Sequence, residues 1–151
     1  MRKIRSVLAR LGRRTRAGEP TTIDIDDPAL RVVVEAFDET EAASAALARA
    51  ARWQPERPAV LRHHLILPAT AVEDAEDLLH EDGWTVRASH RDHARAETPN
   101  TSGDESTVIA LRVQRLDALH CAQESARMAG LAQRFRGRAL GWDAMQPETP
   151  D

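Results

Sequence analysis

Hydrophobic and polar residues alternate along residues 59–68, which read AVLRHHLILP. A period of two is typical of a strand with one buried face, because successive side chains point to opposite sides of a sheet. The alternation predicts that His63 shares the more apolar face with three leucines, and that His64 lies on the other face. Neighbouring histidines of a strand therefore point apart and cannot bind one metal ion together.

The period lengthens to that of a helix in two later segments, 70–83 and 117–136, each of which ends near a glycine. Thr70 and Glu73 form a Thr-x-x-Glu capping-box signal, and Asp117 is a suitable N-cap for the second helix. Three further short apolar runs predict strands, and residues 90–105 predict a polar loop. In chain order we expect strand 60–67, helix 70–83, strand 84–89, strand 106–113, helix 117–136 and strand 139–145.

This βαββαβ order predicts an α+β protein of the ferredoxin-like class, with a four-stranded antiparallel sheet and both helices on one face. With the four predicted strands in the order 4-1-3-2, we expect a small cationic patch on the open face. No aromatic residue falls on the central strands of that face, which argues against stacking of RNA bases there. The open-face residues predicted on this basis are Arg62, Arg87, His64, Val108, Ala110 and Arg112.

Residues 30–37, LRVVVEAF, give two conflicting signals. Asp27 followed by Pro28 is typical of a helix start, whereas three consecutive valines favour a strand. We favour the helix, which would run on to Trp53 and precede the sheet. The chain is then divided into a basic amphipathic arm (1–20), a linker with an N-terminal helix (21–55), the ferredoxin-like domain (56–147) and a tail (148–151).

Charge divides the chain more sharply than the net value of −3 shows. Residues 18–151 hold all 24 acids against 14 basic residues, a net charge of −10, while residues 1–17 of the arm hold seven basic residues and no acid. Ile4, Val7, Leu8 and Leu11 form one helical stripe within it. Such an arm predicts contact with phosphate or an anionic surface. Its basic residues are Arg2, Lys3, Arg5, Arg10, Arg13, Arg14 and Arg16.

The chain carries no apolar run near the roughly 20 residues that span a bilayer. Its single cysteine excludes an internal disulfide and suits a reducing compartment. We therefore expect a cytoplasmic protein.

Motifs for catalysis and for metal binding are missing from the sequence. His90-x-x-His93, joined by His80 or by His120 and Cys121, is the strongest candidate metal cluster, but no zinc signature surrounds it. Cys121 recurs with Met128 and Phe135 at seven-residue steps, which is typical of a core face of a helix. We expect no cofactor, no metal and no enzymatic activity.

Three segments carry a resemblance to a known family: RHHLILPATAVEDAEDLLHEDGWTV, VIALRVQRLDALHCAQESARMAGLAQRF and ALGWDAM. Their His63-His64-Leu65, Gly83-Trp84 and Gly141-Trp142 pieces resemble the RraB family of regulators, which bind and inhibit the endoribonuclease RNase E. The resemblance spans about 56–145. It departs from the family pattern at Leu140, where an acid is expected, and in a longer middle loop.

The resemblance implies a non-catalytic regulator of RNA metabolism that lowers nuclease activity by direct protein contact. An acidic body suits a basic, RNA-binding partner, because complementary potentials steer association. The candidate partner contacts are Glu73, Asp74, Glu76, Asp77, Glu81, Asp82 and Trp142. The alternative hypothesis is an adaptor that binds nucleic acid or an anionic lipid surface through the arm, with Arg62, Arg87 and Arg112 as further candidate contacts to phosphate.

Overall fold

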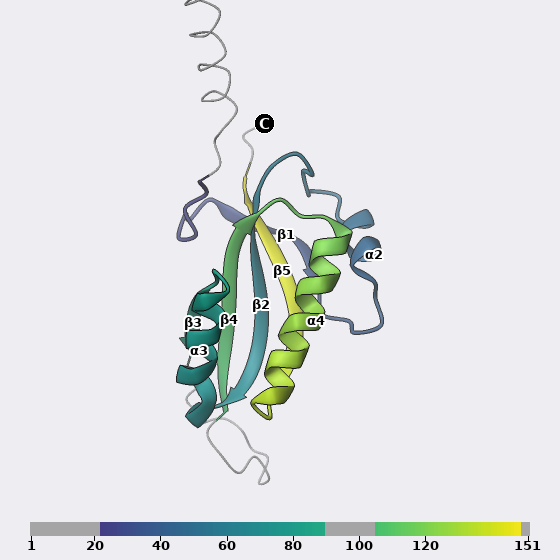
Figure 1. Cartoon of the computed structure of the whole chain (residues 1–151). Coiled ribbons are helices and arrows are strands. Elements are labelled where there is room, and N and C mark those ends of the chain that lie inside the picture. Colours follow the sequence, from purple (N-terminus) through teal and green to yellow (C-terminus); the bar gives the residue numbers. More distant parts are fainter. Residues whose placement is uncertain (1–21, 90–104, 149–151) are drawn as a thin grey trace, which may run out of the picture.

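The computed structural model describes residues 22–89 and 105–148, which form an α+β fold around a five-stranded antiparallel sheet (Figure 1). The strand order is β1-β5-β2-β4-β3. The elements are β1 (Leu30–Ala36), α2 (Ala43–Ala48), β2 (Ala59–Pro68), a 3₁₀ turn (Ala69–Ala71), α3 (Val72–Glu81), β3 (Thr85–Ser89), β4 (Glu105–Gln114), α4 (Ala118–Arg134) and β5 (Arg138–Pro147).

The four predicted strands are confirmed as β2, β3, β4 and β5, and they lie in the predicted order. The expectation of a four-stranded sheet is wrong, because residues 30–36 form a fifth strand and not a helix. β1 pairs with β5 in antiparallel register, with Val34 opposite Ala144. Its valines decide the outcome, since β-branched side chains suit a paired strand and β5 offers a free edge. The helical part of 30–53 is only α2.

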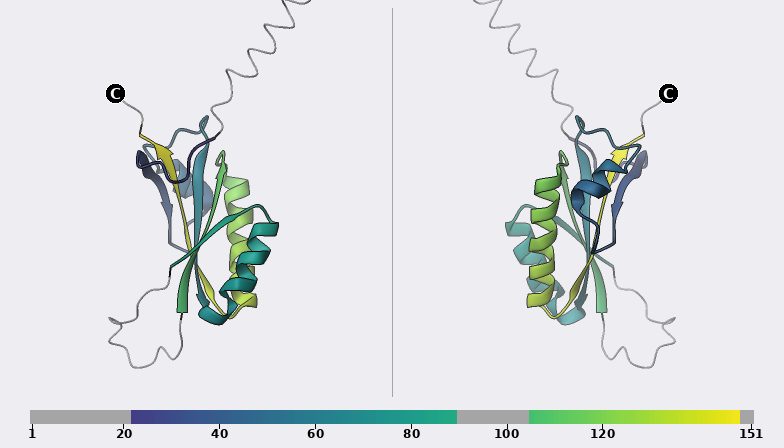
Figure 2. Two further views of the ribbon diagram at one scale, coloured as in Figure 1. Left: turned by 90° about the vertical axis from the view of Figure 1, so that its left-hand side faces the viewer. Right: turned by 90° about the vertical axis from the view of Figure 1, so that its right-hand side faces the viewer.

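The sheet has a helical face, and its core lies beneath α3 and α4 (Figure 2). Leu61, Leu65 and Leu67 of β2 are fully buried there, as their alternation predicts. α2 adds Ala46 and Leu47 to the same core, beside α4 and β1. The Cys121–Met128–Phe135 face of α4 also packs into it, which confirms the predicted core face.

A second, smaller apolar cluster lies on the opposite face. Leu30, Val60 and Leu111 are buried there beneath Ile23 and Ile25. Residues 22–29 therefore cover one end of the face that the sequence predicted to be open. A salt bridge between Asp26 and Arg87 fixes this segment to β3.

The ends of α3 and α4 follow local chemistry with one exception. The Asp117 carboxylate accepts a hydrogen bond from the His120 amide at 2.8 Å and caps α4, as predicted. Gly83 adopts φ +86° just after α3, which also confirms its predicted role in ending the helix. The predicted Thr70–Glu73 box is wrong: the 3₁₀ turn holds Thr70, so Ala71 stands at the N-cap without a side-chain bond.

After β1, the chain passes over β5 at Gly141. β5 is irregular here, since Leu140 has no partner in the register between β2 and β5. Gly141 has φ +141°, and a Cβ atom on it would overlap the Ala36 carbonyl oxygen and the Phe37 Cα. The absence of a side chain at Gly141 thus allows Phe37 to cross β5 and reach the side of the sheet that bears His64.

Of the described helices, none combines the length and the apolar character needed to cross a membrane.

Gly141→Ala should lower the free energy of unfolding by about 2–4 kcal/mol, because the substitution adds a steric overlap to an unfavourable backbone conformation. Gly130→Ala is the matched control, since a Cβ atom there meets nothing within 4 Å and the residue lies inside α4. The control should raise stability by about 0.5–1 kcal/mol. Urea unfolding of both variants measures the difference, and equal stabilities would contradict the crossing described here.

Candidate functional site

The two histidines of β2 lie on opposite faces of the sheet, as the alternation predicts. His63 is buried among the helices, with its ring edge-to-face to Trp84 at 5.3 Å. Its Nε2 atom is buried without a hydrogen-bond partner among the described residues. Burial lowers the pKa of His63 to about 4, and the nearby Arg112 charge adds to this. His63 is therefore neutral at physiological pH.

His64 belongs to an ionic cluster on the other face. The Arg62 guanidinium donates two hydrogen bonds to the Asp143 carboxylate, each 2.6 Å long. His64 Nε2 lies 3.2 Å from the same carboxylate, and the Phe37 ring packs edge-on against the imidazole at 5.3 Å. Asp143 is only 5% exposed, so this pairing is what makes its burial tolerable.

The environment of Asp143 keeps its charge fixed. Burial by itself raises the pKa of this carboxyl, but hydrogen bonds from His64 and Arg62 and their charges outweigh it, so the pKa lies below 3.8. Both carboxylate oxygens are engaged, Oδ1 by Arg62 and Oδ2 by both partners. The cluster thus holds β2 against β5, and its carboxylate is committed to that contact.

The predicted placement of Arg112 on the open face is wrong. Ala110 pairs directly with His63, so Val108, Ala110 and Arg112 share the helical face. The Arg112 guanidinium lies 4.0 Å above the Trp84 ring and forms a 2.6 Å ion pair with Glu124 of α4. Alternation had grouped these three residues correctly, but only the register with β2 decides which face they occupy.

All three arginines predicted for the sheet surface are paired with carboxylates of the same chain. Arg62 binds Asp143, Arg87 binds Asp26 and Arg112 binds Glu124. Contact of these arginines with phosphate stays a prediction, and each would have to compete with an internal partner. The arm residues Arg2, Lys3, Arg5, Arg10, Arg13, Arg14 and Arg16 lie outside the described residues.

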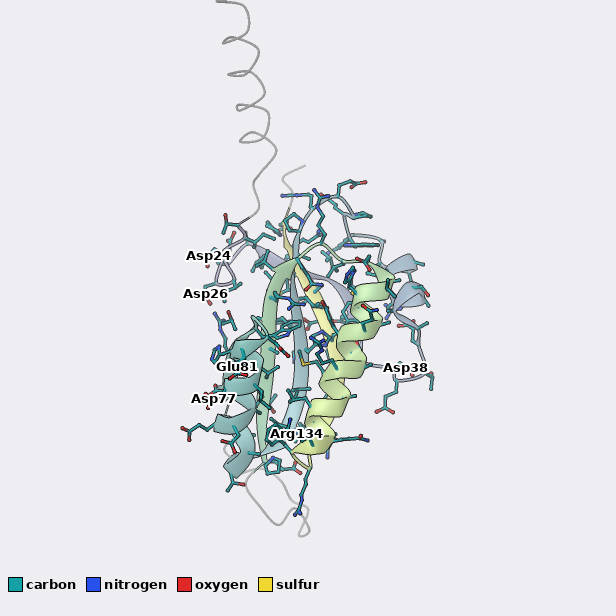
Figure 3. All side chains as sticks on the ribbon, viewed as in Figure 1. Asp24, Asp26, Asp38, Asp77, Glu81 and Arg134 are labelled. Atoms are coloured by element: carbon teal, nitrogen blue, oxygen red, sulfur yellow. The ribbon has the colours of Figure 1, made fainter. Side chains whose placement is uncertain are left out.

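The predicted acidic contacts lie together on α3 and the turn after it. Figure 3 shows Asp77 and Glu81 along this helix. Its buried side consists of Val72, Ala75 and Leu79, which pack on the sheet. Among the six acids, only Asp82 has an ion-pair partner in the described part of the chain, Arg127 at 3.9 Å. We call the six residues the α3 acidic face; they are Glu73, Asp74, Glu76, Asp77, Glu81 and Asp82, all exposed except the half-buried Glu76.

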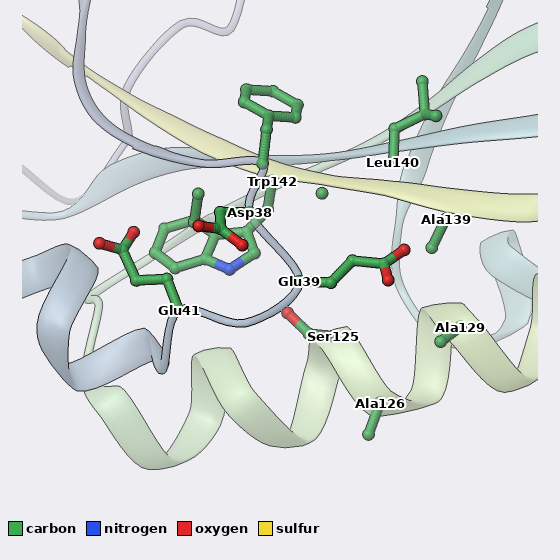
Figure 4. Close-up of a pocket in the computed structure, with 12 residues that line it drawn as sticks. Asp38, Glu39, Glu41, Ser125, Ala126, Ala129, Ala139, Leu140 and Trp142 are labelled. Atoms are coloured by element: carbon green, nitrogen blue, oxygen red, sulfur yellow. The ribbon is translucent and has the colours of Figure 1, made fainter.

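Trp142, the remaining predicted contact, is only 4% exposed and packs in the core on the helical side. It also lines a groove of about 420 Å³ between β5, α4 and the loop after β1 (Figure 4). Ser125, Ala126 and Ala129 of α4 form one wall, and Leu140 lies on the opposite side of β5 from Trp142. The carboxylates of Asp38, Glu39 and Glu41 surround the opening. We call this feature the β5 groove; the rest of its lining is Ala36, Phe37, Ala139 and Gly141.

The candidate catalytic and metal-binding residues are described only in part by the structure. Burial raises the pKa of the Cys121 thiol to about 12, so it is not a nucleophile at neutral pH. Within residues 22–89 and 105–148, no three His, Cys, Asp or Glu side chains come together as metal ligands would. His90 and His93 lie outside the described residues.

Sequence reasoning missed Asp143, Glu124, Phe37 and Glu39. Asp143 carried a signal, since a lone acid inside an apolar strand requires a cationic partner. The partner itself was not readable, because Arg62 lies 81 positions away in the chain. The groove depends on the irregularity of β5 at Leu140, which no local pattern marks.

Comparison with protein-family models, with curated proteins and with solved structures found no match to this chain.

Lowering the pH should destabilise the protein through His63. The unfolded state takes up a proton near pH 6.5, whereas the folded state resists it until about pH 4, so stability is complete above pH 6.5 and falls between these values. The loss should reach roughly 3 kcal/mol at pH 4. Asp143 adds its own loss only below about pH 4, since its pKa is lowered. Urea unfolding between pH 7 and pH 4 measures the slope.

His63→Leu should remove most of that slope, while substitution of the exposed His80 by Gln should leave it unchanged. A slope that survives in the His63 variant would show that another group carries the dependence.

Asp143→Ala should cost about 2–4 kcal/mol of stability, because it leaves the Arg62 guanidinium half-buried without a carboxylate. Asp26→Ala breaks the exposed pair with Arg87 and should cost at most about 1 kcal/mol. Thermal or urea unfolding compares the two variants. Equal losses would mean that the Asp143 cluster does not hold β2 and β5 together.

Proposed function

We propose that this protein is a non-catalytic, protein-binding regulator, of the kind that the RraB resemblance implies, which lowers the activity of a nuclease by direct contact. The α3 acidic face is the observation that supports this most directly. It is a row of carboxylates, most of them without an ion-pair partner among the described residues, on the outer side of a helix whose other side is anchored in the core.

The contact would be electrostatic in its first stage. An acidic row meets a basic, RNA-binding surface of the partner, raises the association rate and competes with the phosphates of RNA for that surface. Inhibition by this route needs no reacting group on the regulator. The internal roles of His63, Asp143 and Cys121 agree with such a mechanism, since each is committed to the core or to a structural contact.

The basic patch that the sequence predicted on the sheet gives less support to an adaptor that binds nucleic acid. Arg62, Arg87 and Arg112 all have carboxylate partners within the described chain. An adaptor would therefore have to bind mainly through the arm. Binding of RNA by this protein in the absence of a nuclease would favour the adaptor hypothesis.

Cleavage of an RNA substrate by RNase E, measured with increasing amounts of the full chain, tests the proposal. We expect stoichiometric inhibition. Asp74→Asn with Asp77→Asn should raise the inhibitory concentration roughly fivefold at low salt, because each exposed ion pair contributes about 0.5 kcal/mol. The effect should shrink as salt is added.

Glu35→Gln with Glu56→Gln is the matched control, since both acids are exposed, lie away from α3 and change the net charge equally. Its inhibition should equal that of the wild type. Inhibition that falls equally in both variants would assign the effect to net charge, and no inhibition by the wild type would refute the proposed function.

A further inference from the structure

Three apolar side chains lie on the open face of the sheet, beyond the end that residues 22–29 cover. The helices pack on the other face (Figure 2). Phe37 is 46% exposed and its ring contacts His64, while Leu140 is 36% exposed and lies on the side of β5 that points away from α4 (Figure 4). Ile66 is half-buried and belongs to neither apolar cluster of the protein. We call Phe37, Ile66 and Leu140 the open-face patch.

The strand register places unlike charges at the two ends of this patch. Arg138 lies opposite Ile66 of β2. Glu35 lies opposite Asp143, so its side chain also belongs to the open face. Both Arg138 and Glu35 are exposed, and neither has an ion pair within the described part of the chain. The stretch of β5 from Arg138 to Asp143 spans roughly 13–16 Å, and Leu140 lies near its middle.

A face with this arrangement is complementary to a second copy of itself. In a twofold contact, a residue at one end of the patch meets the residue at the other end, and the same contact occurs twice. An axis that crosses β5 near Leu140 would place Arg138 of each copy against Glu35 of the other. The apolar side chains near the axis would then cover their counterparts in the second copy.

The charges beneath the patch do not oppose such a contact. Arg62 and His64 both lie against the Asp143 carboxylate, which is only 5% exposed. Burial of a charge is costly when the charge has no partner, and these groups have theirs within the same chain. The centre of the face can therefore be covered without leaving a carboxylate or guanidinium unpaired.

We propose that two copies of this chain associate through their open sheet faces, with the twofold axis across β5 near Leu140. The open-face patch forms the apolar centre, and two pairs of Arg138 with Glu35 close its ends. The association is weak, because interfaces below about 1,200 Å² belong to transient complexes. The proposal does not depend on the proposed function, and the α3 acidic face stays exposed on the outer side of each copy.

The free edge of β1 is a less suitable place for a second copy. An unpaired edge strand can add a strand from another chain, and β1 has a strand neighbour only at β5. However, the Arg49 guanidinium donates a hydrogen bond to the Glu35 carbonyl oxygen, and the register of β1 shifts between Val32 and Val34. Both features interrupt the regular row of backbone groups that a new strand needs.

Sedimentation equilibrium of the full chain, from about 10 μM to about 1 mM, tests the association. We expect the average mass to rise with concentration toward that of a dimer. In NMR spectra over the same range, the amide signals of Ile66 and Leu140 should shift, whereas those of α3 should stay unchanged.

Reversal of one charge and then of both isolates the twofold pairing. Glu35→Arg or Arg138→Glu alone should weaken the dimer about tenfold, because like charges then face each other twice. The double variant restores both pairs with exchanged signs, so its Kd should return to within about twofold of the wild-type value. Glu56→Arg makes the same charge change as Glu35→Arg at an exposed site between α2 and β2 and should have no effect.

Leu140→Ser should abolish the dimer while the dispersed amide spectrum of the folded domain is retained. A mass that stays that of a monomer up to about 1 mM would overturn the proposal. So would growth beyond a dimer, since a twofold contact is closed. A folded double variant that stays as weak as the single ones, or concentration-dependent shifts at α3 in place of β5, would also contradict it.

Discussion

The alternation of side chains along β2 is the constraint on which the rest of the structure depends. β2 lies between β4 and β5, so each of its residues is committed to one face by the pleat of the sheet. His63 therefore enters the core as a neutral ring, and His64 on the opposite face meets Asp143. One short segment thus sets a buried apolar layer and an ionic cluster that fastens β2 to β5.

Charged side chains that take part in internal contacts are less available for contact with a partner. Arg62, His64 and Asp143 hold the sheet together, and Arg112 joins Trp84 to Glu124 across the helical face. Among the described residues, the exposed charged groups without an ion-pair partner include most of the α3 acidic face and Glu39, and also arginines such as Arg52, Arg115 and Arg138.

The sequence predicts those parts of the fold that depend on local signals. The period of two over 59–68 identified β2 and separated the two histidines, and Asp117 marked the start of α4. Residues 30–36 were misread because Asp27 and Pro28 are a local helix signal, whereas the pairing of Val34 with Ala144 lies 110 positions away. The face occupied by Arg112 and the existence of the β5 groove likewise depend on register and on an irregular strand, which pairing alone reveals.

An NMR titration of the imidazole nitrogens of His63 and His64, with and without one equivalent of Zn²⁺, tests this account most directly. It predicts that His63 stays neutral down to about pH 4 and that zinc leaves its ring signals unchanged, because the ring is enclosed on the helical face. Simultaneous zinc shifts of both rings, or protonation of His63 near the usual histidine value of about 6.5, would contradict it.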